Sequence, residues 1–193
     1  MGQRIGLFGG TFDPPHSGHL AAALAARDAL ELDRILLVVA NEPWQKLDKR
    51  NLTAAHHRLA MTELLVKNID GIEASDMEIA RGGLSYTIDT VLQLQDVGHE
   101  VVLVLGADAA GGLNSWERAE ELSRLVRVAV VDRPGHRLPK LDNWSIDKIS
   151  AASLDVSSSQ VRSLMSEGTS TAGSIPSAVK GYIDFHQLEW PGH

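Results

Sequence analysis

The sequence predicts an α/β fold: a doubly wound, Rossmann-like parallel sheet with helices on both faces, followed by a small C-terminal helical part. Two observations support this. First, short runs rich in Val, Ile and Leu alternate along the chain with segments of helical character. Second, those runs are apolar at nearly every position, which is typical of parallel strands buried on both faces. The length of 193 residues suits one domain. We expect that domain to span residues 1–193, with its helical part at about 155–193.

The expected strands are short apolar runs that end at polar or glycine-containing segments. In chain order the apolar runs are residues 5–8, 34–40, 101–105 and 126–131. The more polar residues 72–79 are expected to be a third strand region, and one more short strand is expected within 148–154. The expected helices are alanine-rich or have an apolar stripe of helical period. They are residues 20–26, 56–67, a helix opened by 85–87, a loop-and-helix region around Trp116 and Leu122, and the closing helices 157–167 and 177–188. Residues 41–51 have neither period and predict a loop at the carboxyl end of the second strand.

Composition excludes several classes of function. The chain has no cysteine, which excludes disulfides, cysteine-ligated metals and a thiol nucleophile. Its formal net charge is −7, and no block of lysine or arginine offers the clustered positive charge that nucleic acids require. We expect no membrane partner and a cytoplasmic location, because no apolar stretch of bilayer-spanning length and no signal-peptide pattern is present. The sequence leaves the oligomeric state open, a homo-oligomer included.

The stretch from Gly9 to Leu20 lies between the first expected strand and helix and contains two glycines, two prolines and two histidines. Glycines at such a turn let the backbone approach a ligand or adopt positive φ, and the helix start favours an anion. His16 and His19, three residues apart, can present N–H donors to phosphate oxygens. The alternatives are a tight turn with no ligand, or a histidine pair on a metal. The nearby acidic residues give no recognised zinc spacing. No lysine follows the glycines, so this is not a Walker A loop, and no Gly-x-Gly-x-x-Gly fingerprint is present.

The stretch Gly9 to His19 resembles the (T/S)-F-D-P-x-H-x-G-H motif of the nucleotidylyltransferase superfamily. Four further segments match in order those of bacterial nicotinate-nucleotide adenylyltransferases, the family that the chain resembles more narrowly. They are residues 57–61, the S-Y-T-x-D-T segment 85–90, Gly106-Ala107-Asp108 followed by Trp116, and residues 156–162, which are similar to I-S-S-T-x-I-R.

This resemblance implies adenylyl transfer from ATP to nicotinate mononucleotide, giving deamido-NAD and pyrophosphate, with Mg²⁺ bound to the phosphates. It implies that His16 and His19 contact the reacting phosphates. Around ATP it implies backbone contacts from Gly9, Gly10, Thr11 and Phe12. Ser157, Ser158 and Arg162 would hold the β- and γ-phosphates from a helix start. No residue of the chain is assigned as a metal ligand.

The remaining candidates follow strands expected to end at the same edge of the sheet, where doubly wound folds bind their ligands. Trp116 would stack on the pyridine ring, or pack as an ordinary half-buried side chain. Thr87 would help to read the nicotinate carboxylate. Gly106 and Asp108 would lie near the adenosine ribose, with a helix N-cap as the alternative for Asp108. Arg133 is assigned to ATP, with an ordinary surface arginine as its alternative.

Lys46 is a candidate catalytic cation on the loop after the second strand, with a solvated surface lysine as the alternative. This loop departs from the family, whose P-P-H-K segment is replaced by Asn41-Glu42-Pro43-Trp44-Gln45-Lys46. The alternative functions for the whole chain are a nicotinamide mononucleotide or phosphopantetheine adenylyltransferase, and a non-catalytic nucleotide-binding regulator of the same fold.

Overall fold

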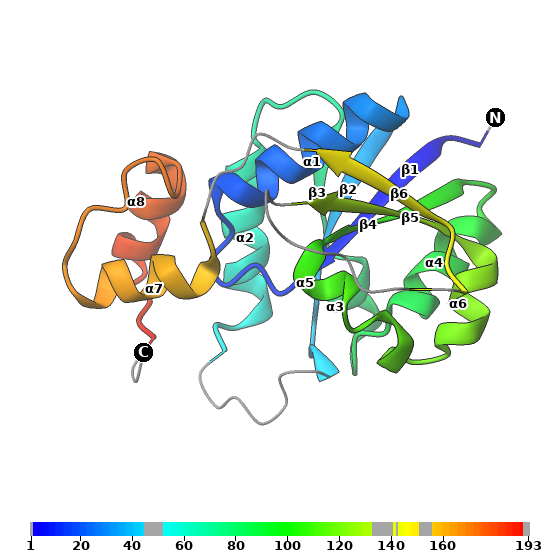
Figure 1. The fold of residues 1–193 in the computed structure, drawn as a ribbon. Helices are drawn as coiled ribbons and strands as arrows, with labels where there is room; N and C mark the ends of the chain where they lie inside the picture. Colours follow the sequence, from blue (N-terminus) through cyan, green and yellow to red (C-terminus); the bar gives the residue numbers. More distant parts are fainter. Residues whose placement is uncertain (1, 45–51, 133–140, 142, 151–155, 191–193) are drawn as a thin grey trace.

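The computed structural model describes residues 2–44, 52–132, 141, 143–150 and 156–190. Its centre is a six-stranded, wholly parallel sheet in the order β3-β2-β1-β4-β5-β6 (Figure 1). The strands are β1 (Arg4–Gly10), β2 (Arg34–Val39), β3 (Ile72–Ser75), β4 (Glu100–Gly106), β5 (Arg127–Asp132) and β6 (Ile146–Ser150). The predicted α/β class and parallel sheet are confirmed.

Helices cover both faces of the sheet (Figure 1). On one face lie α1 (Ser17–Leu30) and α2 (Ala55–Val66). On the other lie α4 (Thr87–Asp96), α5 (Ala107–Ala110), the 3₁₀ turn η2 (Leu113–Ser115) and α6 (Ala119–Leu125), with α3 (Met77–Arg81) next to β2. The chain ends in α7 (Ser158–Ser166) and α8 (Ser177–Phe185), beyond α1 and α2.

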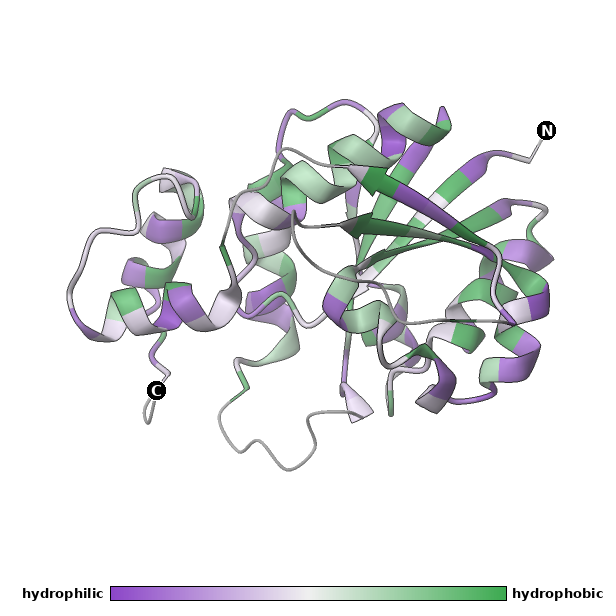
Figure 2. Ribbon diagram, in the orientation of Figure 1, coloured by the Kyte–Doolittle hydropathy of each residue, from purple (hydrophilic) through white to green (hydrophobic). Residues whose placement is uncertain are grey.

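The four inner strands β2, β1, β4 and β5 are largely apolar because successive residues serve two cores, whereas the edge strands β3 and β6 also contain polar residues. In β4, Val102 and Val104 pack with α1, while Val101, Leu103 and Leu105 face α4 and α6. Figure 2 shows the inner strands as mostly hydrophobic ribbon segments, with a hydrophilic stretch in the edge strand β6 and polar and apolar residues mixed along the surrounding helices. No helix within the described residues is long and apolar enough to cross a bilayer.

The expected boundaries needed two corrections. Residues 72–79 are not one strand, because β3 ends at Ser75 and the last residues of the expected strand belong to α3. The glycine pair does not lie in the turn after β1: Gly9 and Gly10 are the last two residues of the strand itself. Neither has positive φ, and the left-handed residue of this loop is Phe12, with φ of 53°.

The strand order places the topological switch point between β1 and β4. From β1 the chain proceeds to β2 and β3 on one side, and then to β4, β5 and β6 on the other. The crossover helices therefore leave in opposite directions at the carboxyl ends of β1 and β4, which opens a crevice there. The motif at the end of β1 lies at this crevice.

Candidate active site

A pocket of about 210 Å³ opens at the carboxyl edge of the sheet, between β1, β2 and β4. Its floor is the end of β1 and two residues of β4, and its walls come from the loops after β2 and α3 and from α5 and Trp116. The lining residues are Gly9, Gly10, Thr11, Ala40, Pro43, Trp44, Glu78, Ser85, Thr87, Leu103, Leu105, Ala109 and Trp116. Five of the predicted site residues are thus brought together: the Gly9–Thr11 segment, Thr87 and Trp116.

Two glycines fit this strand end for different reasons. A Cβ on Gly9 would meet no atom within 4 Å, so its absence leaves the pocket floor open. A Cβ on Gly10 would lie 2.7 Å from the Phe12 ring, which is 2% exposed and packed below the strand. The positive φ of Phe12 turns the backbone so that its ring enters the core. The Phe12 side chain is therefore part of the scaffold, and only its backbone faces outward from the strand end.

The two motif histidines form a stacked pair at the start of α1. Their ring centroids lie 3.6 Å apart, and the His16 backbone N–H donates to Nδ1 of His19 (3.2 Å). His16 is the N-cap of α1 and is buried, while His19 packs edge-on against Phe12. This arrangement holds both imidazoles at the positive end of a 14-residue helix, a position that favours a bound anion.

The start of α7 lies beside the same loop, although the two are far apart in the sequence. Ser157 caps α7 by accepting a hydrogen bond from the Gln160 N–H (3.2 Å). The Ser158 hydroxyl donates to the Pro14 carbonyl (2.9 Å), and Arg162 Nη1 donates to the Asp13 carbonyl (2.8 Å). Two helix N-termini, those of α1 and α7, thus converge on the segment that contains the histidines.

Arg162 also has unused donor capacity. Its Nε is buried and has no hydrogen-bond partner among the described residues. Burial lowers the pKa of Arg162, and the Asp13 carboxylate opposes that shift. An arginine remains charged despite such a shift, and a half-buried cation next to a helix start is suited to a phosphate oxygen.

The loop is held in place by Arg58, which belongs to the matched segment 57–61. Its guanidinium is 1% exposed and donates to the carbonyls of Thr53 (2.7 Å), Thr11 (2.9 Å), Ala40 (2.7 Å) and Asn41 (3.0 Å). One side chain therefore ties the loops after β1 and β2 to the start of α2. Burial lowers the pKa of Arg58, and the Asp13 carboxylate opposes the shift.

Asp13 connects the loop to the C-terminus. Its carboxylate accepts hydrogen bonds from the Thr53 backbone N–H (3.2 Å) and from Nε1 of Trp190 (2.9 Å). Both Asp13 and Trp190 are buried. Asp13 is therefore committed to structure, and Trp190, unassigned from the sequence, anchors the C-terminal helices to the motif.

Trp116 lies at the end of η2, on the α5 side of the pocket. Its indole Nε1 is buried and has no hydrogen-bond partner among the described residues. Buried indole N–H groups usually have one, so this group is placed for a ligand acceptor. Thr87, the first residue of α4, lines the same pocket.

The other predicted residues lie elsewhere at the same edge. Gly106 ends β4 and is the N-cap of α5, which removes the N-cap alternative for Asp108. Asp108 lies in the first turn of α5, is exposed, and does not line the 210 Å³ pocket. Lys46 and Arg133 fall outside the described residues, so their assigned roles stay predictions.

The lining residues that the sequence did not predict include one aromatic and two polar side chains, Trp44, Ser85 and Glu78. An aromatic residue in a polar loop after a strand was a usable signal for Trp44. Ser85 belongs to the S-Y-T-x-D-T segment, but its role is structural, since its hydroxyl accepts from the Asn41 backbone N–H (2.8 Å). Glu78 could not be found, because the sequence placed it in a strand.

Comparison with known proteins agrees with this arrangement. Residues 7–164 match the cytidylyltransferase-like family model. A relative from Gemmatimonas aurantiaca, named "Probable nicotinate-nucleotide adenylyltransferase", is 38% identical over 94% of this chain and 90% of its own length. A relative of the same name from Roseiflexus sp. is 40% identical, covering 95% of this chain and 96% of its own.

Solved structures share the fold. The nicotinic acid mononucleotide adenylyltransferase of Plasmodium falciparum, in complex with NaAD, superposes with a TM-score of 0.82 at 20% identity. That match covers 96% of this chain and 97% of the other. The chain belongs to the cytidylyltransferase-like family and to the nicotinate-nucleotide adenylyltransferases, the family that its motifs resemble.

Proposed function

We propose that this chain transfers the adenylyl group of ATP to nicotinate mononucleotide, giving deamido-NAD and pyrophosphate, a reaction of NAD biosynthesis. One observation carries the proposal: two complementary subsites flank the end of β1. On one side is the stacked His16–His19 pair with two helix N-termini, a setting for phosphates. On the other is a pocket bounded by Trp116 and Trp44, a setting for a flat ring. The names of the relatives support the same reaction.

The chemistry requires little from the protein beyond positioning. A phosphomonoester has a second pKa of about 6, so the acceptor phosphate is mostly a dianion at neutral pH. Its oxygen forms a bond to the α-phosphorus of ATP, and the bond from that phosphorus to the bridging oxygen breaks to release pyrophosphate. No general base is needed for an acceptor that is already ionised. The protein has to bring two anions into line and stabilise the charge that develops on the leaving group.

The residues divide between these two tasks. In the proposal His16 and His19 donate to oxygens around the α-phosphate, where their N–H groups lower the repulsion between the two substrates. Arg162 and the α7 start, with Ser157 and Ser158, bind the β- and γ-phosphates and so the departing pyrophosphate. Trp116 stacks on the pyridine ring and Thr87 contacts its carboxylate. Both roles fix the acceptor rather than take part in bond making.

Mg²⁺ enters the proposal with ATP. Among the described residues, no group of three or more His, Asp or Glu side chains is arranged to hold a metal ion. The buried carboxylate of Asp13 is already engaged by Thr53 and Trp190. The donor set therefore fits a magnesium ion held mainly by phosphate oxygens, as is common for this metal. When bound there, it supplies positive charge that neutralises the phosphates.

A pyrophosphate-release assay with ATP and Mg²⁺ tests the proposal. We expect turnover with nicotinate mononucleotide, and a lower kcat/KM with nicotinamide mononucleotide and with phosphopantetheine. Turnover with one of the other acceptors but not with nicotinate mononucleotide would reject the substrate. Binding of ATP without release of pyrophosphate for any acceptor would favour the non-catalytic regulator.

A further inference from the structure

Glu78 is an unexpected feature of the proposed acceptor pocket. It is 6% exposed, and it is the only charged side chain among the described residues that line the cavity. A buried carboxylate requires compensating partners. Since a pocket for an anionic ring is a poor place for a second negative charge, those partners matter for function.

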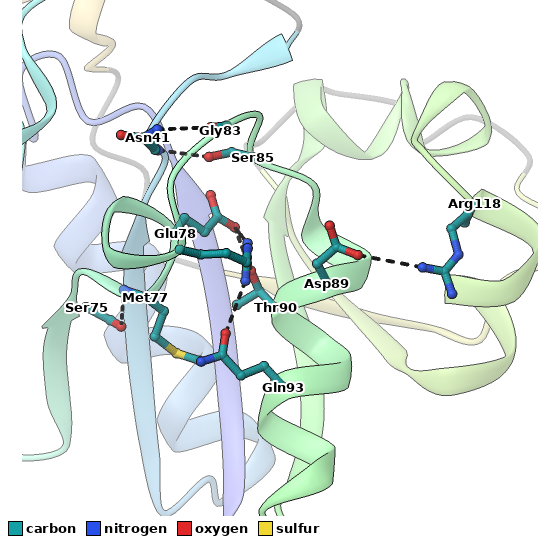
Figure 3. Close-up of polar contacts among 11 residues, drawn as sticks. Asn41, Ser75, Met77, Glu78, Gly83, Ser85, Asp89, Thr90, Gln93 and Arg118 are labelled. Carbon is teal, nitrogen blue, oxygen red and sulfur yellow. Dashed lines mark hydrogen bonds and ion pairs between the residues drawn. The ribbon is translucent and has the colours of Figure 1, made fainter.

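The partners come from α3 and α4 (Figure 3). The Thr90 hydroxyl donates to Oε1 of Glu78 (2.8 Å) and accepts from Nη2 of Arg81 (2.9 Å). The same Arg81 nitrogen lies 3.9 Å from Oε1 of Glu78, and Nη1 donates to Oε1 of Gln93 (3.1 Å). Arg81 thus compensates the Glu78 charge both directly and through a hydroxyl that is fully buried.

This network also frames the segment that faces the ligand. Arg81 precedes residues 82–86 and Thr90 follows them, so their contact closes the base of the loop. On the open side the Asn41 amide donates to the Gly83 carbonyl (2.9 Å), as Figure 3 shows. The position of Ser85 and Thr87 in the pocket wall is therefore fixed at both ends, independently of any ligand.

The charge balance has a direct consequence for the choice of acceptor. Nicotinate has a ring carboxylate, whereas nicotinamide has an amide with N–H donors. An uncompensated Glu78 would repel the first and attract the second, because like charges in a partly enclosed site disfavour binding. With Arg81 in place, the pair is close to neutral and the repulsion is reduced.

We propose that Arg81, by neutralising Glu78 within the pocket wall, is a specificity-determining residue that raises the acceptance of a ring carboxylate at this site relative to that of an amide. The proposal rests on the proposed function, since it concerns the acceptor of that reaction. Arg81 and Glu78 are positioning residues here: they act through the charge and shape of the wall and make no bond to the reacting phosphates.

The test compares kcat/KM for nicotinate and nicotinamide mononucleotides in the full chain and in three variants, R81Q, E78Q and the double variant. R81Q should lower the nicotinate-to-nicotinamide ratio about tenfold or more, mainly through KM for nicotinate mononucleotide, as expected for a newly unbalanced like charge. E78Q should not lower the ratio, and the double variant should recover most of the R81Q loss. R124Q, at an exposed arginine paired with Glu120 on α6, is the matched control and should leave the ratio unchanged.

Two results would overturn the inference: an unchanged ratio in R81Q, or equal losses for both acceptors in R81Q, E78Q and the double variant. The latter would mean that the network only supports the fold. If R81Q does not fold, R81K replaces it, and retention of the charge should retain the ratio, whereas a tenfold loss would count against the proposal.

The same assays distinguish a failure of the proposed function from a failure of the proposed role of Arg81. Wild-type chain without turnover for either acceptor rejects the function, while wild-type turnover with unaltered ratios rejects only the role of Arg81. Affinities of the two mononucleotides, followed by tryptophan fluorescence, test the ratio without catalysis. R81Q should weaken nicotinate mononucleotide selectively, and a wild-type chain that binds neither would reject both proposals.

Discussion

At the scale of single residues, His16 and His19 have a structural role at the start of α1 beside their proposed role in chemistry. His16 caps α1 with its backbone, and the Nδ1 of His19 accepts from that backbone. The acceptor atom on His19 therefore belongs to the cap. The remaining ring nitrogen, Nε2, is the group that the proposed mechanism assigns to phosphate.

This division allows a selective variant. His19→Asn keeps an acceptor oxygen close to the Nδ1 position but removes the ring donor. We expect kcat/KM for adenylyl transfer to fall about 100-fold or more, the usual cost of removing one donor to developing charge. The melting temperature should stay close to that of the wild type. His56→Ala, at an exposed histidine on α2, is the control. Unchanged turnover in His19→Asn would eliminate the phosphate contact.

Arg58, in contrast to the histidines, contributes to the stability of the folded protein and has no proposed role in the reaction. Arg58→Met would remove the arginine donor from four loop carbonyls, one in a buried hydrogen bond and three in part-buried ones. We expect a loss of unfolding free energy of about 3 kcal/mol or more, since each unsatisfied buried group costs about 1–3 kcal/mol. Urea denaturation measures it. A loss below about 1 kcal/mol would show that water replaces the guanidinium.

The sequence identified most of these residues through motifs, and it did so because their chemistry is local. Glycines, prolines and histidines combined in one short stretch point to few functions other than a ligand site. The sequence could not predict contacts between residues far apart in the chain. Examples are the hydrogen bonds that Arg162 donates to the Asp13 carbonyl and that Trp190 donates to the Asp13 carboxylate. These pairs are more than 140 residues apart, and only the tertiary fold brings them together.

At the scale of elements, the end of β1 determines the shape of the site. Gly10 must be glycine because the Phe12 ring lies against its α-carbon, whereas the space at Gly9 is open. Two neighbouring glycines therefore serve packing and ligand access respectively. The sequence suggested positive φ at either, but that conformation is adopted by Phe12 instead.

Alanine substitutions separate the two roles. Gly10→Ala should destabilise the protein by about 1–3 kcal/mol, as expected for overpacking against a buried ring. Gly9→Ala should fold with nearly wild-type stability but raise KM, because its methyl group enters the pocket floor. Thermal unfolding and steady-state kinetics on both variants measure this. A stable Gly10→Ala, or a Gly9→Ala with normal KM, would contradict the respective assignment.

The third expected strand shows where the sequence pattern fails to predict the local structure. The sequence suggests a strand region over residues 72–79, but the chain leaves the sheet at Ser75. In the fold, Glu78 accepts a hydrogen bond from Thr90 on α4 and lies near Arg81. The helical turn Met77–Arg81 places Glu78 and Arg81 on the same side of α3, three residues apart. Tertiary contacts override local preference here, and the error concealed a pocket residue.

At the scale of the whole molecule, the C-terminal helices complete the site. Trp190 donates a hydrogen bond to the Asp13 carboxylate. Helix α8 packs against α2, where the His57 Nδ1 lies 2.9 Å from the Tyr182 hydroxyl. His186 packs against both rings. The start of α7 supplies the second helix N-terminus. Loss of this docking would therefore affect catalysis as well as stability.

The docking should depend on pH. Burial first, and then the nearby His56 and His186, lower the pKa of His57 below its ordinary value of 6.5. The unfolded chain therefore binds more protons than the folded one between the two pKa values, so stability falls as pH decreases below about 6.5. The Tyr182 hydroxyl and Glu63 also face this contact.

Thermal unfolding at pH 7.5 and at pH 5.5 measures the effect. His57→Gln, which keeps a hydrogen-bonding group for Tyr182, should lose less stability than the wild type over this range. An equal loss in both proteins would mean that other groups cause the pH dependence.

The proposed reaction predicts that the α-phosphorus of ATP enters deamido-NAD and that the β- and γ-phosphorus atoms leave as pyrophosphate. Incubation of the chain with Mg²⁺, nicotinate mononucleotide and ATP labelled at the α-phosphorus is the most direct test. The label should appear in deamido-NAD, with an equal amount of unlabelled pyrophosphate. Label that stays in ATP, or that is released as AMP without a dinucleotide product, would contradict adenylyl transfer at this site.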